Sequence, residues 1–177
     1  ATGAKLEDEL ESALETHLAS AEAEQRPTGA AVGRVLSGAQ PLERYVDFLA
    51  SCFQDASSRP FRIGLDCANG AASSVALQLF ERLGITVHAW NVTPDGVNIN
   101  QDCGAVHPQG LQGKVLAEGL EAGFAFDGDA DRLIAVDHLG NVLDGDHILA
   151  ICARHLKDYD TSNRRVVVGT VMSNLGL

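Results

Sequence analysis

Short apolar runs and helical repeats alternate between residues 61 and 126, and this alternation restricts the fold more than any other feature of the sequence. The apolar runs have the length of strands and lie at residues 61–67, 85–90 and 123–126. Apolar side chains at helical spacing fill the two gaps: Val75, Leu79 and Leu83 in the first, and Leu111, Val115, Leu116 and Leu120 in the second. Strand, helix, strand, helix, strand is typical of βαβ units. The sequence therefore predicts an α/β fold with a mostly parallel sheet.

Further elements flank this alternation on both sides. Two apolar segments at residues 133–137 and 142–143 enclose a polar turn, which predicts a hairpin at the edge of the sheet. Similar patterns predict three helices and a last strand, at residues 5–23, 41–54, 146–157 and 164–171. The first helix and the last strand have no partner in the sequence. We therefore expect one complete α/β domain at residues 59–158, the end of a preceding domain at 1–58 and the start of a following domain at 159–177.

Composition and charge exclude several classes of protein. The formal net charge is −11, whereas binding to a nucleic-acid backbone requires clustered Lys and Arg. No apolar run approaches the roughly 20 residues that span a bilayer, and no secretory signal is expected. The four cysteines form no C-x-x-C pair, so neither a zinc knuckle nor a disulfide framework is expected, and three of them are expected in the core: Cys52, Cys67 and Cys152. We expect a cytoplasmic protein with no nucleic-acid or membrane partner.

Three aspartates follow the third strand of the alternation. Asp127, Asp129 and Asp131 stand at alternate positions just beyond a strand end, where α/β sheets bind ligands. Their negative charges repel one another, and a hard cation among the carboxylate oxygens relieves that repulsion. Magnesium is the expected cation. A solvated acidic turn without a function is the alternative.

Two neighbouring positions limit what this loop can bind. An EF-hand calcium loop begins with the same D-x-D-x-D pattern but requires Gly at its sixth position and Glu at its twelfth, where this chain has Arg132 and His138. A calcium sensor is therefore not expected. Arg132 can bind a phosphate group near the metal or can form an ion pair with one of the aspartates, and the spacing alone leaves both roles open.

Residues 125–132, Ala-Phe-Asp-Gly-Asp-Ala-Asp-Arg, resemble the metal-binding loop of the α-D-phosphohexomutases. Other segments narrow the resemblance to the phosphoglucosamine mutases within that family: residues 66–72, 94–100, 103–104, 107–108, 142–146 and 169–176. The resemblance implies the fold of the second phosphohexomutase domain, Mg²⁺ bound by Asp127, Asp129 and Asp131, and a phosphate contact for Arg132. It also implies interconversion of glucosamine 6-phosphate and glucosamine 1-phosphate through a phosphoserine and a bisphosphate intermediate.

The serine loop of that family, T-x-S-H-N-P, has no counterpart in this sequence, and Ser73 and Ser74 belong to the start of a helix. By the resemblance, no catalytic residue is therefore expected in this chain, and the chain is expected to be inactive alone. Its expected partners are a phosphosugar substrate and the remaining domains of the same enzyme, and a homodimer stays open.

The loop at residues 103–109 departs from the family pattern. The family usually has Cys-Gly-Ser-Thr/Ala-His-Pro-Glu, whereas this chain has Cys-Gly-Ala-Val-His-Pro-Gln. His107 can face the cleft and contact substrate or phosphate, or it can fix the loop. Two other functions stay open: a phosphohexomutase for another sugar (phosphomannomutase or phosphoglucomutase), and a non-catalytic module that binds a divalent cation.

Overall fold

The computed structural model has two compact units, residues 1–38 and 39–177. The residues that it describes are 5–20, 27–35, 41–53, 61–159 and 166–176. The first unit contains α1 (Asp8–Ser20) and a short 3-10 helix (Gly29–Ala31). α1 lies within the helix predicted at residues 5–23, but it buries no residue, and the whole apolar stripe is exposed: Leu6, Leu10, Leu14 and Leu18.

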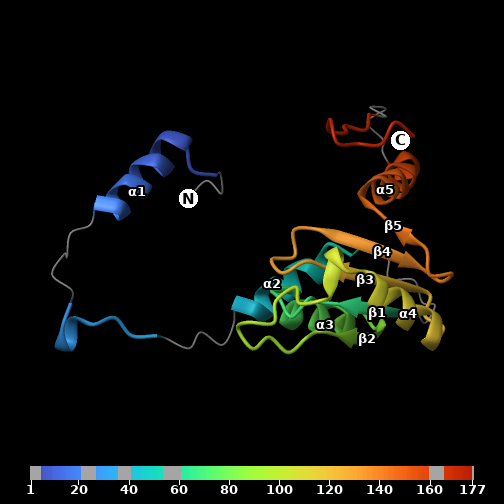
Figure 1. Ribbon diagram of the computed structural model, residues 1–177, viewed down its shortest axis with the longest axis horizontal. Coiled ribbons are helices and arrows are strands. Elements are labelled where there is room, and N and C mark those ends of the chain that lie inside the picture. The colour runs from blue at the N-terminus through green and yellow to red at the C-terminus, as the bar shows by residue number, and fades with distance from the viewer. Residues whose placement is uncertain (1–4, 21–26, 36–40, 54–60, 160–165, 177) are drawn as a thin grey trace. The chain divides into compact units, whose positions relative to one another are not determined.

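A five-stranded sheet organises the second unit (Figure 1). The strands, in the spatial order β2-β1-β3-β4-β5, are β1 (Arg62–Asp66), β2 (Thr86–Trp90), β3 (Ala122–Phe126), β4 (Leu133–Asp137) and β5 (Val142–Leu143). β1 pairs in parallel with both β2 and β3, whereas β3 with β4, and β4 with β5, pair antiparallel. The predicted α/β fold with βαβ units and an edge hairpin is confirmed.

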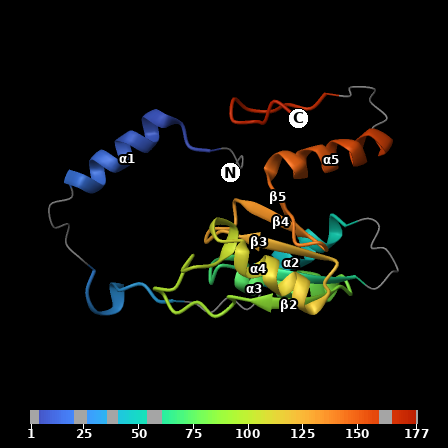
Figure 2. The ribbon, with the colours of Figure 1, turned by 45° about the vertical axis from the view of Figure 1, so that its right-hand side comes forward.

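β1 is the strand at which the chain changes direction across the sheet. From β1 the chain passes through α3 (Ala72–Arg82) to β2 on one side, and then through α4 (Gln109–Glu118) to β3 on the other side (Figure 2). In α/β sheets, a switch of this kind opens a crevice at the carboxyl ends of the two diverging strands. The residues that follow β1 and β3 therefore stand where a ligand site is expected.

Alternate side chains of β1 and β3 pack against α3 on one face of the sheet and against α4 on the other. Ile63 and Leu65 cluster with buried alanines of α3. The cluster on the opposite face contains five buried residues: Leu111, Val115, Leu120, Ala125 and Val136. A glycine in β3 lets α4 approach the sheet, because a Cβ at Gly123 would lie only 2.7 Å from Val115 Cγ2. The sheet is therefore the middle layer between two helical layers.

Replacing Leu111 with alanine is expected to lower the free energy of unfolding by about 2–5 kcal/mol, because the fully buried side chain leaves a cavity between α4 and the sheet. Leu139, which is 64% exposed, is the matched control, and Leu139→Ala is expected to change that free energy by less than about 0.5 kcal/mol. Denaturant unfolding followed by circular dichroism measures both variants. Equal effects of the two substitutions would contradict this description of the core.

Two more helices accompany the sheet. α2 (Pro41–Ser51) packs against α3 through the buried Val46, and Asp47 of α2 forms an ion pair with Arg82 of α3. α5 (Gly145–Tyr159) follows β5 and has 15 residues. Both helices were expected from the sequence, with ends that differ by a few residues. Within the ranges that the structure describes, no helix has the length and apolar character needed to cross a membrane.

The cysteines differ in burial from what the sequence predicts. Cys52, just after α2, and Cys152, in α5, are exposed, so their prediction as core residues is wrong. The apolar residues near them in the sequence lie on helix faces that no other described residues cover. Cys67 is buried as predicted, and burial together with the charge of Asp66 raises the pKa of its thiol to about 12. Cys103 is also buried, which the sequence pattern does not predict.

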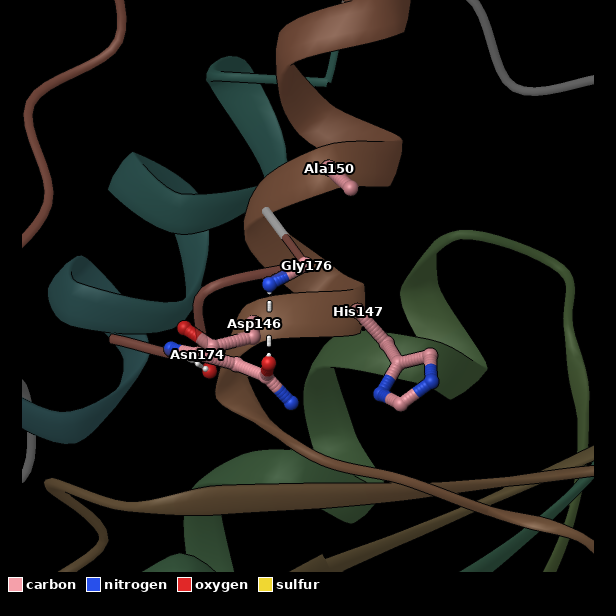
Figure 3. A pocket seen from close by; sticks show the side chains of 5 residues that line it. All are labelled: Asp146, His147, Ala150, Asn174 and Gly176. Carbon is pink, nitrogen blue, oxygen red and sulfur yellow. Dashed lines mark hydrogen bonds between the residues drawn. The ribbon is translucent and has the colours of Figure 1, made fainter. Parts of the chain in front are cut away.

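The prediction of a strand at residues 164–171 is wrong for the part of this range that the structure describes. Residues 166–171 form no strand and the valines at 166, 167 and 168 are exposed, while residues 164 and 165 lie outside the described ranges. A strand requires a partner for its ladder hydrogen bonds, and the sheet ends at β5 without pairing to this segment. The residues that follow this segment contact α5: the Asn174 N–H donates to Asp146 Oδ2 at 2.7 Å, beside a cavity of about 260 Å³ (Figure 3).

Candidate metal centre

The candidate site is the turn between β3 and β4, residues 127–132. Asp127 is the first residue after β3, and the Ala130 N–H donates to the Asp127 carbonyl oxygen at 3.1 Å. The Asp127 N–H donates to the Arg132 carbonyl oxygen at 3.4 Å and closes the turn in front of β4. Ala130 has a φ of 62°, a left-handed conformation that bulky or β-branched residues avoid. The small residue at this position therefore permits a tight turn.

The turn brings the three predicted ligands together. One carboxylate oxygen from each of Asp127, Asp129 and Asp131 lies within 4.8 Å of the other two. Asp127 is 1% exposed, whereas Asp129 and Asp131 are exposed. Carboxylate oxygens are the ligands that hard divalent cations prefer.

The spacing of the oxygens can be compared with what such an ion requires. Around Mg²⁺, with bonds of about 2.0–2.1 Å, two ligand oxygens lie at most about 4.2 Å apart. The upper limit of 4.8 Å on the three separations lies close to that range, so the turn already holds the carboxylate oxygens near one another. The donor set and its spacing fit a hard divalent cation.

Arg132 fixes the buried member of the cluster. Its backbone N–H donates to Asp127 Oδ1 at 2.9 Å, and its Nε–H donates to Asp127 Oδ2 at 2.9 Å. Arg132 Nε also lies 3.6 Å from Asp131 Oδ1. Of the two roles that the spacing leaves open for Arg132, the local ion pair is present. The side chain is 70% exposed, so its terminal nitrogens remain accessible to a ligand.

The carboxylates of the cluster titrate in opposite directions. The hydrogen bond from the Arg132 backbone N–H, reinforced by the Arg132 side chain, holds the pKa of Asp127 below its ordinary value. The charge of Asp129, followed by partial desolvation and the charge of Asp127, raises the pKa of Asp131. At neutral pH, the structure therefore favours the charge on Asp127 and opposes the charge on Asp131.

On acidification, we expect Asp131 to take up a proton before Asp127. The ionised Asp127 stabilises the fold above its unfolded-state pKa, and that contribution is lost as the pH falls through its lowered folded-state pKa. The ionised Asp131 opposes folding, and this cost disappears as the pH falls through its raised pKa. Carboxyl-carbon chemical shifts of the metal-free chain, followed from neutral to acidic pH, measure the order. Protonation of Asp127 at or before that of Asp131 would contradict the described hydrogen bonds.

His107 lies in a loop that contacts the end of β3. A Cβ at Gly104 would lie 2.5 Å from the Phe126 carbonyl oxygen, so this loop packs against the residue just before Asp127. His107 follows the short 3-10 helix at Gly104–Val106, and its N–H donates to the Gly104 carbonyl oxygen at 3.0 Å. Its side chain is exposed, and its ring has no hydrogen-bond partner among the described residues. The structure places the loop of His107 beside the turn without joining the imidazole to the aspartates.

Asp66 is a site residue that the sequence patterns do not single out. It ends β1, is 2% exposed, and accepts two hydrogen bonds of 3.0 Å, from the Ala68 N–H at Oδ1 and from the Gly104 N–H at Oδ2. Ala68 and Asn69 both have left-handed φ angles, of 51° and 50°. The carboxylate of Asp66 therefore ties an unusual turn after β1 to the loop that packs on β3. A charged residue at the end of an otherwise apolar strand is the one local signal of this role.

The fold and the turn together define a class of protein. Residues 43–140 match the sequence model of α/β/α domain II of phosphoglucomutase/phosphomannomutase, and residues 144–177 match that of domain III. A phosphoglucomutase/phosphomannomutase family protein from Burkholderia thailandensis has a similar structure, with a TM-score of 0.59 and 31% identity over 67% of this chain and 26% of that chain. An N-acetylglucosamine-phosphate mutase of the α-D-phosphohexomutase superfamily is also similar, with a TM-score of 0.51 and 27% identity over 64% of this chain and 24% of that chain. The chain belongs to the phosphoglucomutase/phosphomannomutase family.

Curated relatives within the family have a more particular name. The phosphoglucosamine mutase of Desulforudis audaxviator is 49% identical over 100% of this chain and 39% of its own length. The phosphoglucosamine mutase of Clostridium novyi is 45% identical over 99% of this chain and 39% of its own length. The chain thus spans about two fifths of the length of these relatives. The predicted resemblance to the central portion of phosphoglucosamine mutases is confirmed.

Proposed function

We propose that this chain is the metal-binding central part of a phosphoglucosamine mutase that interconverts glucosamine 6-phosphate and glucosamine 1-phosphate. The observation that carries the proposal is the convergence of three aspartates in a chain whose curated relatives are phosphoglucosamine mutases. A phosphoserine elsewhere in the enzyme gives its phosphoryl group to the substrate, and the resulting bisphosphate returns its other phosphate to the serine. The phosphosugar and the remaining domains of the enzyme are therefore the proposed partners of this chain.

Mg²⁺ is the proposed ion at Asp127, Asp129 and Asp131. When bound, it neutralises charge on the phosphoryl group during transfer. Asp127 is the proposed ligand whose position is fixed, because its carboxylate is buried and accepts two hydrogen bonds from Arg132. The exposed Asp129 and Asp131 are the other two proposed ligands. Arg132 uses its Nε–H on Asp127, and its terminal nitrogens are the proposed phosphate contact. His107, whose loop packs on the end of β3, is the proposed second contact to phosphate or substrate.

The division of the chain into domains is also a proposal. One complete domain is proposed at residues 59–158, with the end of a preceding domain before it and the start of a following domain after it. The match to the sequence model of domain III begins at residue 144 and therefore includes α5. The division proposed here instead places α5 at the end of the domain at residues 59–158. The enzyme is proposed to be cytoplasmic, and a homodimer is the first assembly to test.

The chain alone is expected to have no mutase activity, because its sequence contains no counterpart of the family's serine loop. A coupled assay that follows the conversion of glucosamine 1-phosphate measures this directly. Turnover above the background without protein would contradict the proposed division of labour between this chain and the rest of the enzyme.

A segment exchange tests the function itself. In the full-length phosphoglucosamine mutase of Desulforudis audaxviator, the matching residues are replaced with this chain, which is 49% identical to them. The chimera is expected to retain turnover. Asp129→Asn within it is expected to reduce turnover at least about 100-fold, because the loss of residues that only support metal ligands already costs about 10- to 100-fold. Asp102→Asn removes the same charge from an exposed loop and serves as the control. A folded chimera without turnover would contradict the proposal.

A phosphohexomutase for another sugar is the second candidate. One similar solved structure favours it, since that structure is of a phosphoglucomutase/phosphomannomutase family protein. Comparison of kcat/KM for the 1-phosphates of glucosamine, glucose and mannose in the complete enzyme separates the candidates. A preference for glucose or mannose would replace the proposed substrate and keep the metal site.

A further inference from the structure

The turn after β1 is in direct backbone contact with the turn that carries the aspartates. The Ala71 N–H donates to the Gly128 carbonyl oxygen at 2.8 Å. A Cβ at Gly70 would overlap that oxygen and would lie 2.7 Å from Gly128 Cα. Gly70 is not among the residues with a positive φ. The missing side chain of Gly70 therefore serves the close approach of two backbones and not a special conformation.

A second segment also contacts Gly128. A Cβ at Gly128 would lie 2.6 Å from Ile99 Cδ1 and 2.8 Å from Asn100 Nδ2. Asn100 is itself tied to the turn after β1, because its N–H donates to the Ala68 carbonyl oxygen at 2.9 Å. The backbone of Gly128 is thus held by two segments that are themselves hydrogen-bonded to each other.

Gly128 lies between two of the proposed ligands, so a shift of its backbone moves both Asp127 and Asp129. Mg²⁺ demands near-ideal octahedral geometry and tolerates little displacement of its ligands. A Cβ at Gly70 would have to move from 2.7 Å to an ordinary contact with Gly128 Cα of about 3.5–4.0 Å. A shift of roughly 1 Å at a functional site costs on the order of 100-fold in function.

We propose that Gly70 and Ala71 are positioning residues for the metal ligands, and that they hold Gly128 where the carboxylates of Asp127 and Asp129 converge. This inference rests on the proposed metal-binding function of residues 127–132. Neither Gly70 nor Ala71 supplies a ligand, and both act through the backbone of Gly128.

The test is the Mn²⁺ affinity of the 177-residue chain, measured by the enhancement of water-proton relaxation. Gly70→Ala adds the overlapping Cβ. Ala71→Pro removes the N–H that donates to Gly128, and the φ of −60° at Ala71 suits a proline ring. Both variants are expected to raise the Mn²⁺ dissociation constant at least about tenfold. Gly113→Ala is the matched control: a Cβ at this position in α4 would meet nothing within 4 Å, and the affinity is expected to stay within about twofold.

Amide chemical shifts of the metal-free chain give a second readout, which a uniform loss of stability would not change selectively. In Gly70→Ala and Ala71→Pro, the signals of residues 127–132 are expected to move, while those of β5 stay in place. Wild-type Mn²⁺ affinity in the folded variants would overturn the inference. Unfolding of both variants would also overturn the inference, because the contact with Gly128 would then be needed for the stability of the whole domain and not for the position of the ligands alone. If only one variant unfolds, the Mn²⁺ affinity of the folded variant tests the inference.

The wild-type chain separates this inference from the function on which it rests. A wild-type chain that binds no Mn²⁺ would contradict the proposed metal site, and the positioning role would fail with it. Binding by the wild type with no loss in the variants would leave the metal site intact and remove the positioning role alone.

Discussion

Asp66→Ala is expected to lower the free energy of unfolding by about 2–5 kcal/mol. The substitution leaves two buried backbone donors, the Ala68 and Gly104 N–H groups, without their acceptor, and each such group costs about 1–3 kcal/mol. The left-handed turn at Ala68 and Asn69 also loses the carboxylate that holds it. Denaturant unfolding of the wild type and the variant measures the difference.

Asp95 offers a matched control for this prediction. Its Oδ1 accepts two backbone N–H groups as well, from Val97 and Asn98 at 2.9 Å each, but it stands in an exposed loop where water can replace it. Asp95→Ala is therefore expected to cost less than about 1 kcal/mol. If Asp66→Ala and Asp95→Ala lower the free energy of unfolding equally, the burial of the Asp66 hydrogen bonds does not explain their contribution to stability.

Asp127→Asn is expected to weaken Mn²⁺ binding at least about 100-fold. The variant loses one negative charge and one ligand oxygen, and residues that only support metal ligands already account for 10- to 100-fold. It also places an amide NH₂ group against the N–H donors of Arg132, which occupy both oxygens of Asp127 in the wild type. Water-proton relaxation during a Mn²⁺ titration measures the affinity.

Asp102→Asn is the control that separates a specific site from general attraction by an acidic chain of net charge −11. Asp102 is exposed and has a φ of 52°, a conformation that asparagine adopts readily. Its substitution removes the same charge and is expected to change the Mn²⁺ affinity by less than about twofold. Equal losses in Asp102→Asn and Asp127→Asn would mean that overall charge, and not the turn, attracts the ion.

The helices and strands of the sheet domain were predictable because the apolar residues in each of them follow one clear spacing, that of a helix or that of a strand. The strand expected at residues 61–67 is β1 (Arg62–Asp66). Of the four apolar residues predicted for the helix after residue 110, Leu116 is 55% exposed, and three are buried in α4 and the turn after it: Leu111, Val115 and Leu120. In these segments the apolar pattern and the available partner agree.

The pattern fails where an apolar face has no partner among the described residues. Residues 164–171 have the composition of a strand, yet the described part, residues 166–171, forms no strand and pairs with none of the strands of the sheet. Cys152 and the leucine stripe of α1 are exposed for the same reason. A sequence period shows which side of an element is apolar, and it does not show what covers that side.

The candidate site also has one part that the sequence could predict and one part that it could not. Asp127, Asp129 and Asp131 lie within one short turn, so their convergence could be predicted from spacing. The contact of Asp66 with Gly104 spans 38 positions, and no local pattern indicates which loops meet across the end of the sheet. Non-local backbone contacts such as this one required the structure.

A Mn²⁺ titration of the isotopically labelled chain, read through its backbone amide signals, tests the metal site most directly. Paramagnetic broadening removes signals near the bound ion and reports even weak occupancy. We predict that the signals from Phe126 to Arg132 disappear first and that Asp129→Asn abolishes this selective loss. Broadening that affects the acidic first turn of α1 as early as the turn at residues 127–132 would contradict a metal site there.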